Sequence, residues 1–358
     1  MENMALTSRK NFFVAGATLA AASALPGVVF AAAPLPMQDQ KADADMQRVI
    51  VALAAFNAPA FFTTVPRIAR ELPSFADAYQ AVLAMDGKPG VEAVASTMHK
   101  IIDGPGGPIL LRIHTPAGAG PMPVTMYYHG GGFVFANLDT YDATPRAIAN
   151  AAGTITVSVA YRQAPEHPFP AAPEDAFAAY RWVLANAAAI GGDPKRVAVL
   201  GESAGGNLAA GVAIAARDRG VPMPVHQVLV YPVTTYSETP PSSYVENAMT
   251  LPLSTPGLTW FGKYYLSKPG DALKPLASVI RANAKGLPPA TILNADLDPL
   301  RDDGAAYEAH LRSAGVTVNR KVYLGVTHEF FGMSGVVAKS RLAIQDAAAA
   351  LKRSFGTA

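Results

Sequence analysis

The chain of 358 residues contains no cysteine. This absence excludes a disulfide framework, a zinc site built on thiolates and a cysteine nucleophile. Charge is also scarce, because only 16% of the residues are Asp, Glu, Lys or Arg and the formal net charge is +2. Lysine and arginine form no dense block, so we expect no nucleic acid or other polyanion among the partners.

Beyond its N-terminus the chain lacks an apolar run long enough to span a bilayer. At the N-terminus, Arg9 and Lys10 precede an apolar stretch that begins at Phe12 and ends in small residues at 31–33. This order is typical of a secretory signal. We therefore expect residues 1–33 to be an export signal, and the mature protein to be periplasmic or secreted without a stable membrane anchor. General secretion and a twin-arginine-like route both fit, and an uncleaved anchor is the alternative.

Half of the residues are hydrophobic, which suits one large core or two smaller ones. Short apolar runs alternate with helical patterns along most of the chain, and this alternation predicts an α/β fold with a mostly parallel eight-stranded sheet and helices on both faces. The predicted strands cover residues 94–102, 109–115, 124–128, 155–161, 197–200, 225–231, 290–295 and 318–323.

Two segments depart from the alternation of strands and helices. Residues 34–88 are helical with proline breaks, and residues 234–265 are rich in proline and aromatic side chains. We expect these segments to form a helical cap over the sheet, and residues 89–358 to form the catalytic domain that includes the second cap segment. No internal repeat or low-complexity linker indicates a further domain.

The chain contains the pentapeptide Gly201-Glu202-Ser203-Ala204-Gly205 between a predicted strand and an alanine-rich helical stretch. In that setting G-x-S-x-G is typical of a nucleophile elbow, a strained turn that exposes the serine hydroxyl. Glycines flank it because bulkier side chains would clash with the neighbouring strand and helix. The motif predicts that Ser203 is the nucleophile of a serine hydrolase.

A serine nucleophile needs a base, an acid that orients the base, and donors for the oxyanion. In this arrangement the acid and then the histidine follow the serine along the chain. His328 comes directly after the last predicted strand and is the predicted base. His310 lies inside a predicted helix, and we expect it to have a structural role.

The acid should follow the predicted strand at 290–295. Asp296 and Asp298 both fit this position, and physical reasoning on the residues does not separate them. Asp302 and Asp303 are expected to cap the next helix, where carboxylates accept free N–H groups.

A glycine-rich loop, His129-Gly130-Gly131-Gly132, follows the predicted strand at 124–128. Such a loop lets the main chain approach a ligand and direct N–H groups at it. The predicted oxyanion donors are therefore the N–H groups of Gly131, Gly132 and Ala204. His129 is expected to form structural hydrogen bonds.

Five stretches of the sequence resemble the hormone-sensitive-lipase-like esterases, also called bacterial family IV. The stretches are HGGGF at 129–133, YRQAPEHPFPAA at 161–172, GESAGGN at 201–207, DPLRDDG at 298–304 and HEF at 328–330. The resemblance covers the chain from about residue 90 and implies that Asp298 is the catalytic acid. Two residues depart from the family pattern: Glu202 replaces Asp or Thr, and Gln163 replaces a common Leu.

The resemblance implies an α/β-hydrolase fold and a carboxylic ester hydrolase that acts on small esters with short acyl chains through Ser203, Asp298 and His328. A carbohydrate acetyl esterase or an amidase on the same fold is an alternative. A ligand-binding homologue is a further one, which the presence of His328 disfavours. No metal or organic cofactor is implied, and a monomer and a homodimer both fit. Six side chains are candidates for the substrate pocket, although core packing explains each equally well: Phe133, Phe135, Tyr231, Leu253, Trp260 and Phe261.

Overall fold

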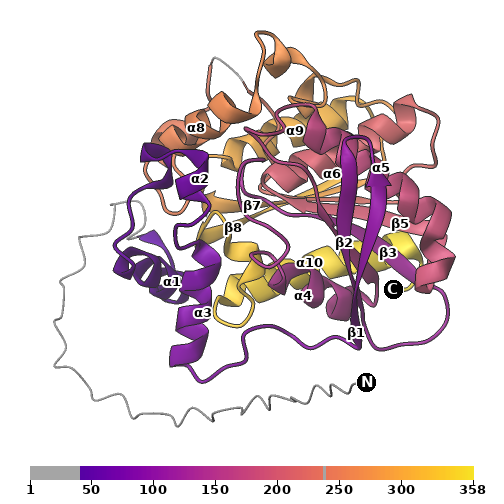
Figure 1. Cartoon of the computed structure of the whole chain (residues 1–358), viewed down its shortest axis with the longest axis horizontal. Coiled ribbons are helices and arrows are strands. Elements are labelled where there is room, and N and C mark those ends of the chain that lie inside the picture. The colour runs from indigo at the N-terminus through magenta and orange to yellow at the C-terminus, as the bar shows by residue number, and fades with distance from the viewer. Residues whose placement is uncertain (1–40, 237–238) are drawn as a thin grey trace, which may run out of the picture. The chain divides into compact units, whose positions relative to one another are not determined.

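The computed structural model of the chain describes residues 41–236 and 239–358 (Figure 1). The predicted export signal, residues 1–33, lies outside the described residues. Within the described part, no helix combines the length and the apolar character needed to cross a membrane.

One sheet of eight strands organises the fold, as the sequence predicts, in the spatial order β1-β2-β4-β3-β5-β6-β7-β8. β2 is antiparallel to β1 and β4, and every other neighbouring pair is parallel. The mostly parallel sheet is therefore confirmed. The strands are β1 Ser96–Gly104, β2 Gly107–Thr115, β3 Met122–Tyr128, β4 Ile155–Ala160, β5 Gly192–Glu202, β6 Gln227–Val230, β7 Ala290–Leu297 and β8 Val318–Thr327.

Helices cover both faces of the sheet. One apolar cluster joins the sheet to α5, α6 and α9, and a second cluster joins it to α4 and α10. Because both faces are covered, β3 and β6 are buried along almost their whole length rather than alternating between buried and exposed residues. The helices are α1 Ala44–Ala55, α2 Pro66–Ala69, α3 Phe75–Met85, α4 Ala143–Ala152, α5 Ala171–Asn186, α6 Ala204–Asp218, α7 Ser243–Glu246, α8 Thr255–Tyr265, α9 Arg301–Ser313 and α10 Ala338–Phe355. Short 3-10 turns are η2 Phe61–Thr63, η3 Ala187–Ile190, η4 Asp271–Leu273, η5 Val279–Arg281 and η6 Phe330–Gly332.

The first predicted cap segment is divided between two surroundings. α1 and α3 pack into the apolar cluster of α10, and the Tyr79 hydroxyl accepts a hydrogen bond from the N–H of Gly335 at 3.0 Å. The chain between them, with η2 and α2, lies instead beside α8 of the second cap segment (Figure 1). There the Trp260 indole donates to the carbonyl of Thr64 at 2.9 Å. The η2–α2 stretch and α8 thus form one aromatic wall.

Candidate active site

Ser203 occupies the sharp turn between β5 and α6, with φ 57° and ψ −117°. A Cβ added at Gly201 would lie 2.0 Å from the carbonyl oxygen of Gly205, and one at Gly205 would lie 1.9 Å from that of Tyr128. Both distances are far below van der Waals contact with backbone atoms, so the turn requires glycine at both positions, for the reason predicted from the sequence. A non-glycine residue with such a φ is strained, which is common at functional sites.

His328 and Asp298 meet at the carboxyl ends of two neighbouring parallel strands, β8 and β7. The Nδ1 atom of His328 lies 2.7 Å from Oδ2 of Asp298, and both side chains are buried. The other carboxylate oxygen of Asp298 accepts the N–H of Leu300 at 2.9 Å. The structure thus favours Asp298, the acid that the family resemblance implies, because Asp296 is partly exposed and lies 4.0 Å from the guanidinium of Arg301.

Asp302 and Asp303 do not cap α9, so that expectation is wrong. They lie in the first turn of the helix, but no side chain caps its end. Asp302 accepts the N–H of Ser243 at 3.0 Å, and Asp303 accepts the N–H of Thr234 at 3.0 Å. Their carboxylates therefore hold the second cap segment on α9 instead.

The two histidines that are expected to have a structural role each have a ring nitrogen close to a backbone carbonyl oxygen. The Nε2 atom of His310 lies 2.8 Å from the carbonyl oxygen of Ala282. His129 is buried, its Nδ1 atom lies 2.8 Å from the carbonyl oxygen of Gly130, and its ring stacks on Tyr161. Burial lowers the pKa of His129 to about 4, so the ring is neutral at physiological pH.

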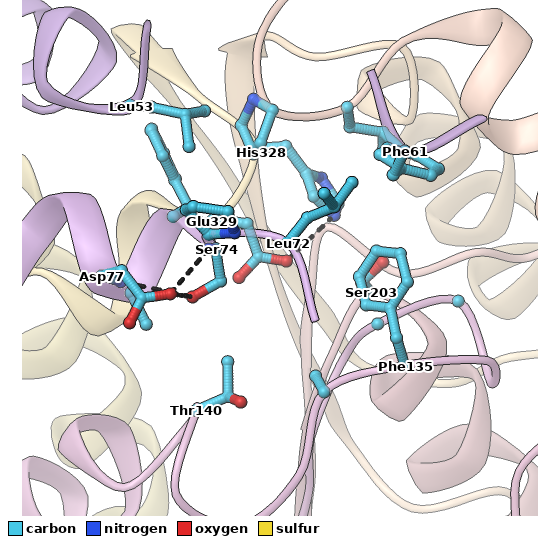
Figure 2. A pocket seen from close by; sticks show the side chains of 18 of the residues that line it. Leu53, Phe61, Leu72, Ser74, Asp77, Phe135, Thr140, Ser203, His328 and Glu329 are labelled. Carbon is cyan, nitrogen blue, oxygen red and sulfur yellow. Dashed lines mark hydrogen bonds and ion pairs between the residues drawn. The ribbon is translucent and has the colours of Figure 1, made fainter. Parts of the chain in front are cut away.

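Ser203 and His328 both line one cavity of about 820 Å³ (Figure 2). Because Asp298 holds Nδ1, the Nε2 atom of His328 is left for the cavity. No hydrogen bond joins the Ser203 hydroxyl to His328 in residues 41–236 and 239–358. Catalytic hydrogen bonds of this type are often long without substrate and shorten when the substrate is bound.

The glycine loop after β3 borders the same cavity. Gly131 and Gly132 have φ 93° and 60°, a conformation that favours glycine. A Cβ on Gly131 would lie 2.2 Å from the carbonyl oxygen of Phe135, and one on Gly132 would lie 2.1 Å from the ring of Phe261. The third predicted donor, Ala204, begins α6, where an N–H has no partner within the helix.

Carboxylates surround the imidazole of His328. Burial alone would lower its pKa, but the negative charges of Asp298, Glu329 and Glu202 outweigh burial and raise the pKa above its usual value. Asp298 is the strongest of these and also accepts the hydrogen bond. The surroundings of His328 therefore favour its protonated form.

Glu202, one of the two residues that depart from the family pattern, is fully buried beside the site. Burial, with the nearby charge of Glu329, raises its pKa to about 7. The Tyr127 hydroxyl donates to Oε1 at 2.5 Å, and the Tyr231 hydroxyl donates to Oε2. Both carboxylate oxygens of Glu202 therefore have a partner, which partly offsets the cost of burying the group.

Three of the six pocket candidates, Phe135, Leu253 and Phe261, line the cavity. The other three do not line it, so those predictions are wrong.

Each of the three residues outside the cavity contacts another part of the structure. Phe133 stacks on Tyr265 with ring centroids 3.8 Å apart. The Tyr231 hydroxyl donates a hydrogen bond to Glu202, and the Trp260 indole N–H donates one to the first cap segment. These contacts come from residues far apart in the sequence, so a local pattern did not indicate them.

Two residues at the site were missed by the sequence reasoning, Glu329 and Tyr141. Both line the cavity, and the Tyr141 hydroxyl donates to Oε1 of Glu329 at 2.5 Å. A carboxylate directly after the predicted base was the available signal, whereas nothing local marked Tyr141.

A protein-family profile described as "alpha/beta hydrolase fold" matches residues 125–332, which include the glycine loop, the elbow, Asp298 and His328. The chain belongs to this α/β-hydrolase family. Esterase LipI of Mycobacterium tuberculosis is 45% identical over 241 residues, which cover 66% of this chain and 75% of LipI.

An ethyl acetate hydrolase of Pseudomonas putida is 41% identical over 214 residues, which cover 59% of this α/β-hydrolase and 67% of the relative. Among solved structures, the hyperthermophilic esterase from Pyrobaculum calidifontis superposes with a TM-score of 0.79 at 38% identity, covering 91% of this chain and 100% of that one. The resemblance to hormone-sensitive-lipase-like esterases drawn from the sequence is confirmed.

Proposed function

We propose that this α/β-hydrolase is a carboxylic ester hydrolase that cleaves short-chain acyl esters through an acyl-enzyme on Ser203. The enzyme class follows from the relatives, which are named esterases and an ethyl acetate hydrolase. The observation that carries the catalytic assignment is the 2.7 Å contact between His328 and Asp298 on the cavity that Ser203 also lines.

In the proposed reaction the Ser203 hydroxyl attacks the ester carbonyl while Nε2 of His328 removes its proton. Asp298 keeps the other ring nitrogen protonated and stabilises the imidazolium. The N–H groups of Gly131, Gly132 and Ala204 stabilise the tetrahedral oxyanion. His328 then protonates the leaving alcohol, and a water molecule repeats the sequence on the acyl-enzyme.

We expect the acyl chain of the substrate to lie along one side of the cavity. Phe135, Leu253 and Phe261 form an apolar wall there, and Phe61 of the first cap segment lies over it with its ring centroid 5.1 Å from that of Phe261. The ring centroid of Phe135 in turn lies 5.0 Å from that of Phe261, so these side chains offer one continuous apolar surface to an acyl chain. The name of the P. putida relative, an ethyl acetate hydrolase, supports short acyl chains.

The test is hydrolysis of p-nitrophenyl butyrate by the wild type and by Ser203→Ala, with covalent labelling by a fluorophosphonate. We expect the variant to keep its fold by circular dichroism, and to lose both turnover and labelling. Turnover retained in a folded Ser203→Ala variant would remove Ser203 from the role. A wild type that binds esters but neither turns over nor reacts with the label would identify a ligand-binding homologue.

We also propose that the protein is exported, that residues 1–33 are removed, and that residues 34–88 and 234–265 act together as the cap of the catalytic domain. The support for export is the basic, apolar and small-residue order of the first residues. N-terminal sequencing of the protein recovered from the periplasm or medium tests the cleavage, and a start at Met1 would refute it. Light scattering of the mature protein decides between the monomer and the homodimer.

A further inference from the structure

Glu329 follows His328 directly and lies on the wall of the cavity (Figure 2). Its φ of 71° is unusual for a residue with a side chain. Oε1 of its carboxylate lies 3.9 Å from Nε2 of His328 and accepts the Tyr141 hydroxyl at 2.5 Å. Its Oε2 accepts no hydrogen bond from residues 41–236 and 239–358. Glu329 therefore presents one unpaired carboxylate oxygen in the cavity.

Glu202, the other buried glutamate of the site, provides a contrast. Two tyrosine hydroxyls occupy its two oxygens, and the residue is fully buried. The side chain of Glu329 is 21% exposed. Of the two carboxylates, Glu329 is thus the one that a ligand in the cavity can contact.

The reaction places the leaving alcohol beside Glu329. Nε2 of His328 delivers a proton to the alcohol oxygen, so that oxygen lies within roughly 3 Å of Nε2. Oε1 of Glu329 lies 3.9 Å from the same nitrogen. A group on the second carbon of the alcohol lies roughly 3–4 Å from the ester oxygen by ordinary bond lengths. Such a group can therefore reach the carboxylate.

The surrounding charge favours a cation at this place. Apart from the catalytic His328, Arg70 is the one basic residue among the described residues that line the cavity, and its guanidinium is already bound to Glu166 and to the carbonyls of Val134 and Ala164. Figure 2 shows the polar side chains Ser74, Asp77 and Thr140, together with Leu53, on the side of Glu329, whereas Phe61 and Phe135 lie toward Ser203. The side of Glu329 is thus the more polar side of the cavity.

We propose that Glu329 is a specificity-determining residue that selects esters whose alcohol carries a protonated amine on the carbon next to the ester-bearing carbon. The proposal rests on the ester hydrolysis proposed above and names its preferred alcohol. A hydrogen bond from a cationic donor to a carboxylate provides a roughly ten- to hundredfold preference.

The test compares 2-(dimethylamino)ethyl acetate with 3-methylbutyl acetate at pH 7. The two esters have the same acyl group and nearly the same shape, but only the first carries a protonated amine. Release of acetate gives kcat/KM for each ester, and dividing by the hydroxide-catalysed rate constant removes the difference in intrinsic reactivity. We expect the wild type to prefer the cationic ester at least tenfold, and Glu329→Gln to bring this ratio to within about threefold of one.

Asp139→Asn is the matched control, because it removes one negative charge from the rim of the same cavity without touching Glu329. Its ratio should stay within about twofold of the wild type, since the Asp139 side chain is exposed and its charge is screened. If Glu329→Gln does not fold, Glu329→Asp withdraws the carboxylate by one methylene group and should lower the ratio at least threefold.

A wild type that hydrolyses both esters without preference would overturn the proposal and leave the ester hydrolase intact. The same conclusion follows if Glu329→Gln, or Glu329→Asp in its place, keeps the wild-type ratio. Hydrolysis of neither ester, together with no labelling by a fluorophosphonate, would overturn both this proposal and the function on which it rests.

Discussion

Gly205→Ala tests how strictly the elbow depends on its glycines. The added Cβ would lie 1.9 Å from the carbonyl oxygen of Tyr128 and 2.5 Å from that of His129. Both are backbone atoms at the end of β3, and neither can retreat without shifting a central strand. Overpacking of this kind costs 1–3 kcal/mol when side chains can adjust, and here they cannot, so we expect a loss of about 3 kcal/mol or more.

Gly211→Ala is the matched control in the same helix. The nearest atom to its added Cβ would be Cδ2 of Leu276 at 3.7 Å, an ordinary van der Waals contact. Since alanine is the better residue in a helix interior, this variant should gain about 0.5–1 kcal/mol.

Thermal unfolding followed by circular dichroism measures both variants. A domain of about 320 residues shifts its Tm by about 1.5 °C per kcal/mol. Gly205→Ala should therefore lower the Tm by about 4–5 °C or more and slow fluorophosphonate labelling, whereas Gly211→Ala should raise the Tm by about 1 °C and label normally. A Gly205→Ala variant with the Tm and labelling rate of the wild type would refute the steric reasoning.

Three further predictions concern the charged groups of the site. Asp298→Asn should lower kcat on p-nitrophenyl butyrate on the order of 10³–10⁴-fold, because an amide does not hold the His328 tautomer; a loss below tenfold contradicts this role. In the wild type, burial lowers the pKa of His328, but Asp298 raises it by more, so the net pKa lies above 6.5. We therefore expect kcat/KM to fall with decreasing pH at a midpoint above 6.5. Burial raises the pKa of Glu202 from 4.5 to about 7, and the folded protein therefore loses about 3 kcal/mol of stability from this group as pH rises through that interval. Glu202→Gln should abolish this loss, and urea unfolding near pH 5 and pH 8 measures it; an equal pH dependence in both proteins contradicts the assignment.

The fold could be predicted because each of its central strands leaves a recognisable pattern in a short stretch of sequence. β3, β4 and β6 are buried on both faces, so each appears in the sequence as a short, mostly apolar segment without charged residues between turns. The elbow was equally local, since the strain at Ser203 needs glycine within two residues on either side.

The contacts across the site could not be predicted in this way. The sequence left Asp296 and Asp298 equivalent on physical grounds, and only the pairing of β7 with β8 brings Asp298 to His328. Phe133 and Trp260 were aromatic residues close to predicted site segments, yet their rings pack against side chains or carbonyls distant in sequence. Side-chain direction at such positions depends on tertiary neighbours.

Phe61 contacts the rings of Phe135 and Phe261 from a turn that precedes β1 and every catalytic loop in the chain. The apolar wall of the cavity therefore includes a segment that is separate in sequence from the loops that carry Ser203, Asp298 and His328. Replacing the η2–α2 stretch with that of another family member would change this part of the cavity wall and leave the catalytic loops unchanged. Variant libraries that aim to admit bulkier acyl groups can accordingly be confined to this short stretch, because the catalytic residues lie in other segments.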